Sequence, residues 1–140
     1  MRPLVIDASV WVSAAEPKES WSGPSQAFLS VVAEQGHPVA LPEFAKLEIA
    51  CALARRLRSP RQGRVLARRT FDSPLVTTHP LSRDLLQRSV SVGTRRLLRS
   101  GDAIYAALAE AVGGELVSWD KELVERVGAV TPEAWVERRR

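Results

Sequence analysis

The chain contains few of the residues from which disulfides and zinc sites are built. Its 140 residues include one cysteine, Cys51, and two histidines, His37 and His79, which are far apart in the sequence. A single cysteine excludes an internal disulfide and any zinc site made of several thiolates, and it is typical of a reducing compartment. Because the two histidines are isolated, we also expect no zinc cage.

Long apolar segments are also missing. No uncharged apolar run approaches the roughly 18 residues needed to span a bilayer. Arg2 is followed closely by Asp7, so the N-terminal segment is too short and too acidic for a secretory signal. We therefore expect a soluble, cytoplasmic protein that does not act at a membrane.

The length and composition suit one compact domain. The chain has 140 residues and a hydrophobic fraction of 45%, and domains usually contain about 100 to 200 residues. We expect a single domain over residues 1–140. Residues 131–140 are predicted to be a tail anchored by Trp135, mobile from about residue 136.

Basic residues exceed acidic ones, which favours an anionic partner. The net charge is +4 and the pI is about 10.0. Arginines form two groups, the first of which contains no acid: Arg55, Arg56, Arg58, Arg61, Arg64, Arg68 and Arg69, then Arg95, Arg96 and Arg99. Guanidinium groups form paired hydrogen bonds with phosphate or carboxylate, so Arg55, Arg56, Arg95 and Arg96 are candidates for binding RNA or an acidic partner segment. A solvated basic helix face explains the same pattern equally well.

Strand-like and helix-like segments alternate along the chain. Short aliphatic and β-branched runs predict strands at residues 4–6, 39–41, 75–78, 116–119 and 129–130. Helical spacing and end signals predict helices at residues 11–15, 20–35, 42–57, 61–71, 82–92, 102–112 and 121–127, with Gly93 interrupting the chain before residues 95–99. Such alternation is typical of an α/β fold with a mostly parallel sheet covered by helices on both faces.

Asp7 closes the first predicted strand. It follows the apolar run Leu4–Ile6 and precedes Ala8 and Ser9. Functional sites in parallel α/β sheets gather beyond the carboxyl ends of the strands, so Asp7 is the first candidate site residue. The alternative is that this segment only turns the chain, with Asp7 accepting local hydrogen bonds.

Glu48 is the only charged residue between Leu47 and Ala54, in a helix that is apolar on every side and is therefore expected to be mostly buried. A buried carboxylate must be paired, hydrogen-bonded, protonated or bound to a cation. A buried ion pair with an arginine is the structural alternative to a functional role. Glu43 lies in the first turn, where capping and the helix dipole explain it, and it points away from the Glu48 direction.

Asp102 and Asp120 both precede predicted helices. Asp102 opens an alanine-rich helix that ends at Gly113, and Asp120 follows the apolar strand that begins at Leu116. Helix capping explains each of them adequately when taken alone. Together with Asp7 and Glu48, however, they are predicted to meet at one edge of the sheet.

These motifs resemble those of PIN-domain ribonucleases, and most of all the VapC toxins of VapBC toxin–antitoxin pairs. The matching segments span nearly the whole chain: Val5–Ser9, Leu47–Ala50, Gly101–Ala109 and Leu116–Asp120. No single motif is specific, but four acids in this order, each in its apolar context, are fairly specific together.

The resemblance implies a three-layer α/β/α sandwich with a mostly parallel sheet of five strands. It implies that four catalytic acids hold Mg2+ or Mn2+: Asp7, Glu48, Asp102 and Asp120. It also implies that the hydroxyl groups of Ser9 and Ser118 support these acids. Many relatives carry another acid two positions after the last aspartate; here that residue is Glu122, whose longer side chain leaves its role undecided. The resemblance further implies an RNA substrate, a small antitoxin as partner and a homodimer.

The chemistry of the acids supports the same conclusion without the resemblance. Four carboxylates gathered in one place repel one another and their pKa values rise, unless a cation neutralises them. Oxygen ligands without cysteine or histidine favour Mg2+ or Mn2+ over zinc. We therefore predict in-line attack by metal-activated water, which on the RNA substrate that the resemblance implies would leave 5′-phosphate and 3′-hydroxyl ends.

Two other functions remain open at this point. A noncatalytic RNA-binding or partner-binding module could keep the same fold, although acids facing phosphate would weaken RNA binding. A phosphatase of the haloacid dehalogenase type also places an aspartate after its first strand. Such enzymes usually carry a second aspartate two residues later, where this chain has Ser9.

Overall fold

A parallel sheet of four strands forms the centre of the computed structural model, which describes residues 1–139. The strands are β1 (Leu4–Ile6), β2 (Val39–Pro42), β3 (Val76–His79) and β4 (Glu115–Val117), arranged in the order β3-β2-β1-β4. Leu4 pairs with Val39 on one side and with Glu115 on the other. Strands β1 and β4 therefore end level with each other, and the residues that follow them lie at the same edge of the sheet.

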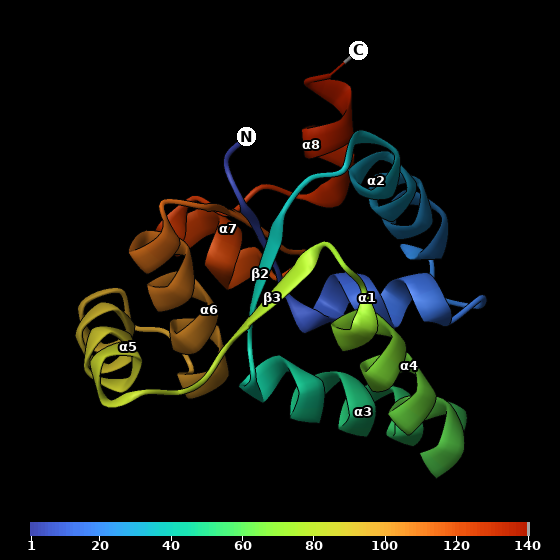
Figure 1. Cartoon of the computed structure of the whole chain (residues 1–140), viewed down its shortest axis with the longest axis horizontal. Helices are drawn as coiled ribbons and strands as arrows, with labels where there is room; N and C mark the ends of the chain where they lie inside the picture. The colour runs from blue at the N-terminus through green and yellow to red at the C-terminus, as the bar shows by residue number, and fades with distance from the viewer. Residues whose placement is uncertain (140) are drawn as a thin grey trace.

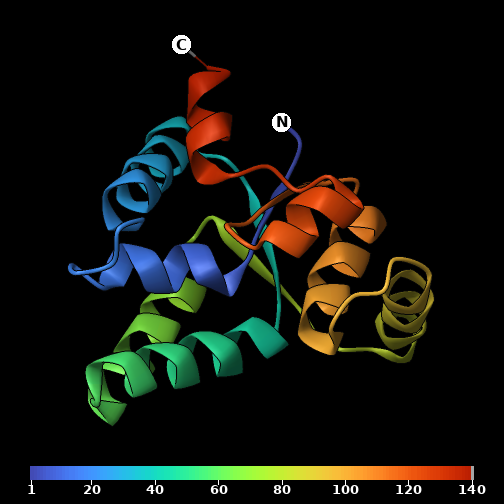
Figure 2. The same ribbon diagram turned by 180° about the vertical axis from the view of Figure 1, so that it is seen from behind.

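Helices cover both faces of this sheet and make the three-layer α/β/α arrangement (Figure 1, Figure 2). Helix α6 packs on β1, β2 and β4, with α5 outside it, while α1, α2 and α4 lie toward the opposite face. None of the described helices is long and apolar enough to cross a bilayer. The helix bounds are α1 (Ala8–Ala15), α2 (Ser22–Gln35), α3 (Phe44–Leu57), α4 (Pro60–Asp72), α5 (Arg83–Arg95), α6 (Ser100–Val112), α7 (Lys121–Val127) and α8 (Pro132–Glu137).

The core lies between the sheet and these helices. Strand β1 is buried along its whole length, which agrees with its unbroken run of aliphatic residues. On one side, α6 contributes an almost continuous buried segment from Ala103 to Ala109. Its alanines allow α6 to lie close to the strands, so the first turn of α6 is held firmly at the edge where β1 ends.

The sheet has four strands, so the prediction of five was wrong. Residues 129–130 form only an isolated parallel bridge, between Val130 and Val117. Val130 exchanges backbone hydrogen bonds with Ser118 at 3.0 Å and with Leu116 at 2.9 Å. The chain then leaves the sheet at once, because the Thr131 hydroxyl accepts a hydrogen bond from the Ala134 amide and starts α8.

The predicted C-terminal tail contains this short helix. Trp135 anchors it as expected: its ring is fully buried and lies edge-on to Phe28 with 5.0 Å between ring centroids. The mobility expected from about residue 136 stays a prediction, and the last residue of that segment, Arg140, lies outside the described part of the chain.

Two element boundaries differ from the sequence prediction for identifiable reasons. Pro42 ends β2 instead of opening a helix, and α3 begins at Phe44. Gly93 does not interrupt α5, which continues to Arg95. A Cβ atom at Gly93 would lie 2.8 Å from the Cβ of Ala103, so the glycine serves the close packing of α5 against α6.

A similar close approach between α3 and α4 predicts an effect on stability. A Cβ atom at Gly63 would overlap the carbonyl oxygen of Ala50 and lie 2.9 Å from the Cβ of Ala54. We expect Gly63→Ala to lower the free energy of unfolding by about 1–3 kcal/mol, although alanine is the better helix former. Urea denaturation measures the change. Gly23→Ala is the matched control, because Gly23 lies in α2 and a Cβ atom there would meet no atom within 4 Å; equal effects of the two substitutions would contradict the packing explanation.

Candidate metal centre

The ends of β1 and β4 bring the first and last predicted acids to the same place. The amide of Asp7 donates a hydrogen bond of 3.0 Å to the carbonyl of Val117, so Asp7 and Ser118 leave neighbouring strands side by side. Both residues are buried. The site is therefore built where two buried neighbouring strands end.

Two hydroxyl groups hold the Asp7 carboxylate. Its Oδ2 atom accepts hydrogen bonds from Ser9 Oγ at 2.9 Å and from Ser118 Oγ at 2.6 Å. Asp7 precedes α1, but its side chain makes no capping bond to that helix. Because Ser118 is 111 residues away in the sequence, a local turn alone does not account for the Asp7 side chain. The supporting role of the two serines stays a prediction.

The two carboxylate oxygens of Asp120 have different partners: one caps α7 and the other faces the cleft. Oδ1 accepts hydrogen bonds from the amides of Glu122 at 2.8 Å and Leu123 at 3.2 Å, and so caps α7. Oδ2 accepts a hydrogen bond of 2.6 Å from Arg99 Nη2. The capping alternative is thus correct for one oxygen, and the other oxygen remains available to the site.

Asp102 lies in the first turn of α6 but does not cap it. The helix begins at Ser100, and its N-cap residue, Arg99, makes no side-chain capping bond. The Asp102 side chain is only 13% exposed, and its Oδ2 atom accepts a hydrogen bond of 3.2 Å from Arg99 Nε. Capping therefore does not explain this acid.

Glu48 reaches the same cleft from α3. Its Oε1 atom accepts a hydrogen bond of 2.7 Å from the hydroxyl of Tyr105. Within residues 1–139, Glu48 forms no ion pair with an arginine, so the proposed structural alternative is wrong. The expectation that its helix is mostly buried was also wrong: its buried residues are Ala45, Ile49 and Leu53, whereas Leu47 is 61% exposed and Cys51 is exposed.

All four predicted acids line one cleft of about 350 Å³. They come from four separate elements: the end of β1, α3, the start of α6 and the N-cap of α7. Gly101 lets two of these elements approach, since a Cβ atom there would lie 3.3 Å from Glu48 Oε2. The other lining residues are Ala8, Ser9, Val12, Ala52, Arg56, Arg99 and Gly101.

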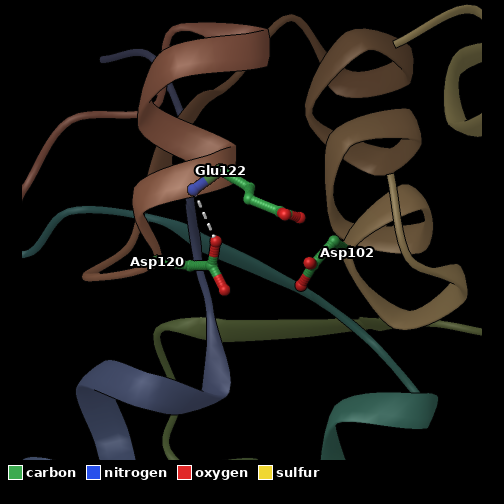
Figure 3. Close-up of side chains that lie close together, drawn as sticks. All are labelled: Asp102, Asp120 and Glu122. Carbon is green, nitrogen blue, oxygen red and sulfur yellow. Dashed lines mark hydrogen bonds between the residues drawn. The ribbon is translucent and has the colours of Figure 1, made fainter. Parts of the chain in front are cut away.

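Glu122 joins this group, although the sequence left its role undecided. One oxygen each from Asp102, Asp120 and Glu122 lies within 4.8 Å of the others. Figure 3 shows the three carboxylates converging between the first turns of α6 and α7. The signal in the sequence was that Glu122 follows Asp120 by two residues. Asp120 caps α7 and holds the first turn of this helix beside α6, which brings the Glu122 side chain close to Asp102.

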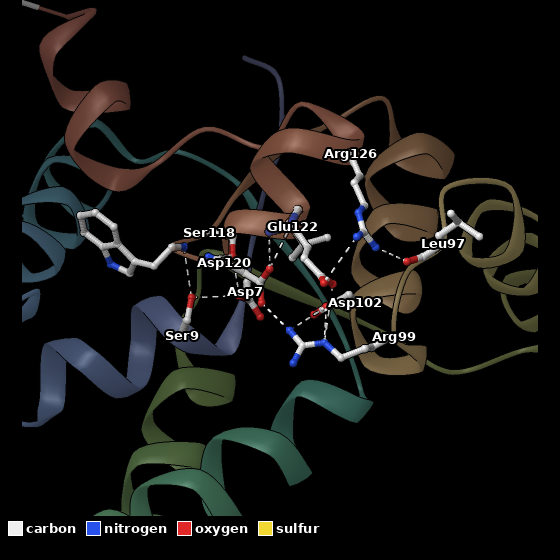
Figure 4. Close-up of polar contacts among 11 residues, drawn as sticks. Asp7, Ser9, Leu97, Arg99, Asp102, Ser118, Asp120, Glu122 and Arg126 are labelled. Atoms are coloured by element: carbon white, nitrogen blue, oxygen red, sulfur yellow. Dashed lines mark hydrogen bonds and ion pairs between the residues drawn. The ribbon is translucent and has the colours of Figure 1, made fainter.

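Arg99 and Tyr105 are two further site residues that sequence reasoning missed. The sequence groups Arg99 with basic surface residues, but its guanidinium lies among the acids, 3.2 Å from Asp102 and 3.9 Å from Glu122 (Figure 4). Arg99 and Tyr105 each lie three residues from Asp102 in the sequence, Arg99 at the N-cap of α6 and Tyr105 within that helix, so one helical turn brings both near Asp102. That spacing was the available signal.

Burial and mutual repulsion raise the pKa values of three of the acids. The pKa of Asp7 is raised mainly by burial, which outweighs the hydrogen bonds from Ser118 and Ser9. Burial is also the main cause of the raised pKa of Glu48, to which the charges of Asp7 and Asp102 add. The pKa of Asp102 is raised by burial and then by the charge of Asp120. The cleft therefore disfavours its own negative charges and favours a cation.

The donor atoms fit a hard divalent cation. Every side chain in the acid group offers oxygen, and neither histidine nor cysteine is among the described residues that line the cleft. Carboxylates and hydroxyl groups are typical ligands and supports for Mg2+ and Mn2+. Asp102, Asp120 and Glu122 are close enough together to share one ion, and Asp7 and Glu48 line the cleft beside them.

The four arginines suggested as binding residues are all exposed. Arg56 lines the rim of the cleft and pairs with Glu16 at 2.9 Å and Glu19 at 3.5 Å. Arg95 pairs with Glu110 at 3.6 Å. Arg55 and Arg96 form no ion pair within the described residues. Their role in binding RNA or a partner stays a prediction.

The fold and site agree with a comparison against protein families. Residues 4–129 match the family model described as PIN domain. The chain belongs to the PIN-domain family. No curated protein matches the chain in sequence.

Solved structures share this fold at low sequence identity. PAE2754 from Pyrobaculum aerophilum has a TM-score of 0.72 at 21% identity, with 98% of this chain and 88% of that chain covered. The Mycobacterium tuberculosis toxin VapC20, described as cleaving the sarcin–ricin loop, has a TM-score of 0.71 at 18% identity, with coverages of 84% and 89%. FitAcB from Neisseria gonorrhoeae has a TM-score of 0.69 at 18% identity, with coverages of 92% and 97%. The chain is thus similar in fold to VapC toxins.

The raised pKa of Glu48 predicts how metal-free stability depends on pH. Its folded pKa exceeds the unfolded value, so the ionised form is disfavoured by folding, and stability falls as the pH rises from about 4 through the folded pKa. Glutamine cannot ionise and keeps an acceptor for the Tyr105 hydroxyl. We expect Glu48→Gln to be more stable than wild type at pH 7 in EDTA, by less than about 1 kcal/mol because the site is partly exposed.

Denaturation in urea at several pH values measures this difference, which should vanish below pH 4. Glu43→Gln is the control for loss of one charge, since Glu43 is exposed at the start of the same helix. An E48Q variant that is no more stable than wild type at pH 7 would contradict the electrostatic interpretation.

Proposed function

We propose that this protein is a metal-dependent endoribonuclease and the toxin of a type II toxin–antitoxin pair. The observation that carries the proposal is the convergence of Asp7, Glu48, Asp102 and Asp120 in one cleft. Burying acids together is unfavourable without a cation. Four elements of the fold each contribute one of these acids, and together the acids form a site for a divalent ion. The chain has a PIN domain, and solved structures with a similar fold include a toxin.

We assign Mg2+ or Mn2+ as the cofactor. Asp7, Glu48, Asp102 and Asp120, the predicted ligands, would hold the ion. Glu122 would join them, because one of its oxygens lies within 4.8 Å of oxygens of Asp102 and Asp120. A bound divalent cation supplies a more acidic water and neutralises negative charge on a phosphate group. Ser9 and Ser118 orient Asp7 through the hydrogen bonds to its Oδ2 atom.

The carboxylates of the cleft are the groups that could accept a proton from the attacking water. Glu48 is held in place among them, because its Oε1 atom accepts a hydrogen bond from the Tyr105 hydroxyl. Among the described residues, no histidine lines the cleft to take this role. Hydrolysis by an in-line water would leave 5′-phosphate and 3′-hydroxyl ends.

RNA is the substrate that the charge of the protein supports. The net charge of +4 and the exposed arginines would attract a polyanion, whereas the acids of the cleft would repel phosphate unless a cation is bound. A noncatalytic RNA-binding module gains nothing from those acids. Cleavage of cellular RNA would place the protein in the cytoplasm.

Cleavage of a mixed RNA substrate tests the activity. We expect cleavage with Mn2+, none with excess EDTA, and a loss of at least roughly a hundredfold in Asp7→Asn. Asp84→Asn is the matched control, because Asp84 lies on α5 and pairs with Arg88 away from the cleft. Circular dichroism checks that both variants fold. Activity that survives chelation or D7N would exclude the metal mechanism, and metal-independent RNA binding without cleavage would favour a noncatalytic module.

The similar structures also suggest the partner. They include a toxin–antitoxin complex from Klebsiella pneumoniae, with a TM-score of 0.66 at 19% identity and coverages of 92% and 97%. We propose that this chain binds a small antitoxin that covers the cleft, and that it forms a homodimer.

The neighbouring reading frame provides a direct test of the partner. We expect that co-expression with the protein it encodes yields a complex in size-exclusion chromatography and suppresses RNA cleavage. Light scattering of the toxin alone gives the oligomeric state. A monomer, or cleavage that continues in the presence of that protein, would contradict the corresponding part of the proposal.

A further inference from the structure

Arg99 places a positive charge inside the acid group. Its Nη2 atom lies 2.6 Å from Asp120 Oδ2 and 3.2 Å from Asp102 Oδ2, and its Nε atom lies 3.9 Å from Glu122 Oε2. These are the same three acids whose oxygens approach one another closely enough to share a metal ion. The guanidinium and a divalent cation would therefore be neutralising the same charges.

The two cations would also use the same oxygen atoms. Asp120 Oδ1 is occupied by two amides of α7, so Oδ2 is the oxygen that remains for a ligand in the cleft. Arg99 takes that oxygen, and it takes Asp102 Oδ2 as well. A metal ion bound by Asp102 and Asp120 through these atoms would meet the guanidinium at short range, where like charges repel strongly.

We propose that Arg99 is a built-in competitor of the divalent cation, which holds the Asp102–Asp120–Glu122 group in the metal-free protein and withdraws when the ion binds. The inference rests on the proposed metal site and adds a determinant of its affinity. Binding of the divalent ion then replaces the guanidinium of Arg99 at the acids. The breaking of the Arg99 ion pairs lowers the affinity of the site for the ion.

The surroundings of Arg99 allow such an exchange. Its side chain is 70% exposed, whereas those of Asp102 and Asp120 are 13% and 21% exposed, so the guanidinium reaches into the cleft from the solvent side. A guanidinium does not lose its proton in the physiological range, and the neighbouring acids raise the pKa of Arg99 further. Release therefore requires the side chain to rotate outward and does not require deprotonation.

Contacts that do not involve Arg99 hold the chain segment before α6. Arg126 donates a hydrogen bond to the carbonyl of Leu97 and pairs with Glu122 at 3.6 Å (Figure 4). The amide of Leu98 donates a hydrogen bond of 2.8 Å to the carbonyl of Gly93. Because these contacts anchor the connection independently, Arg99 is not needed as a structural strut, and removing its side chain should leave the cleft intact.

Titration calorimetry with Mn2+ tests the competition directly. We expect Arg99→Ala to bind Mn2+ about tenfold more tightly than wild type, a change of about 1.4 kcal/mol, because the ion no longer displaces the exposed ion pairs of Arg99. Arg96→Ala is the matched control: it removes the same charge three residues earlier, from an exposed side chain with no ion pair in the described structure. Its affinity should stay within about twofold of wild type if long-range charge contributes little.

Thermal unfolding provides a second readout that does not depend on activity. Without metal, Arg99→Ala should unfold at a lower temperature than wild type, because the acids lose their internal cation. With saturating Mn2+, its gain in unfolding temperature should be larger than that of wild type.

Equal or weaker Mn2+ affinity in Arg99→Ala would overturn the competition and leave the proposed metal site standing. An equal gain in affinity in Arg96→Ala would also overturn it, because the effect would then be one of overall charge. Wild-type binding that is lost in Asp102→Asn verifies that the ion occupies this cleft, and a lack of Mn2+ binding by wild type and Arg99→Ala would overturn the metal site and the competition together.

Discussion

The burial of several carboxylates in one cleft, to which their mutual repulsion adds, is the constraint on which the site depends. Asp7 is the most constrained of them, because it is 6% exposed and cannot turn toward solvent. The hydroxyls of Ser9 and Ser118 stabilise its ionised form, yet burial still raises its pKa. Hydrogen bonds alone therefore do not compensate for the charge, and a cation at this place gains binding energy from each acid that it neutralises.

The register of the parallel sheet creates this repulsion. Strands β1 and β4 end level, so Asp7 and Asp120 leave the sheet within a few residues of each other. Small residues then let the helices approach: Gly101 leaves room for Glu48, and alanines bring α6 onto the strands. The same close packing that excludes water from the core thus forces the acids together at its edge.

The sequence predicted the parts of the site that depend on local pattern. An acid directly after a buried strand identified Asp7, and an acid alone in an apolar helix identified Glu48. It also predicted a mostly parallel α/β fold from the alternation of elements. Three-dimensional packing decided the rest. Arg99 had the sequence context of a basic surface, and only the approach of α6 to α7 turns its side chain onto Asp102 and Asp120. The prediction of a fifth strand was wrong for a similar reason: α8 begins at Pro132, so residues 129–130 form only one bridge with β4.

Asp120 shows that one residue can cap a helix and still contribute to the candidate site. A carboxylate has two oxygens, and the fold uses only one of them to cap α7. The positive end of that short helix also favours a negative charge at its N-cap. Capping therefore stabilises Asp120 in the orientation that presents its second oxygen to the cleft, and the same cap positions Glu122 next to Asp102. For an acid at the start of a helix, the useful question is thus where the second oxygen points, since a capping role for the first oxygen does not exclude a ligand role for the other.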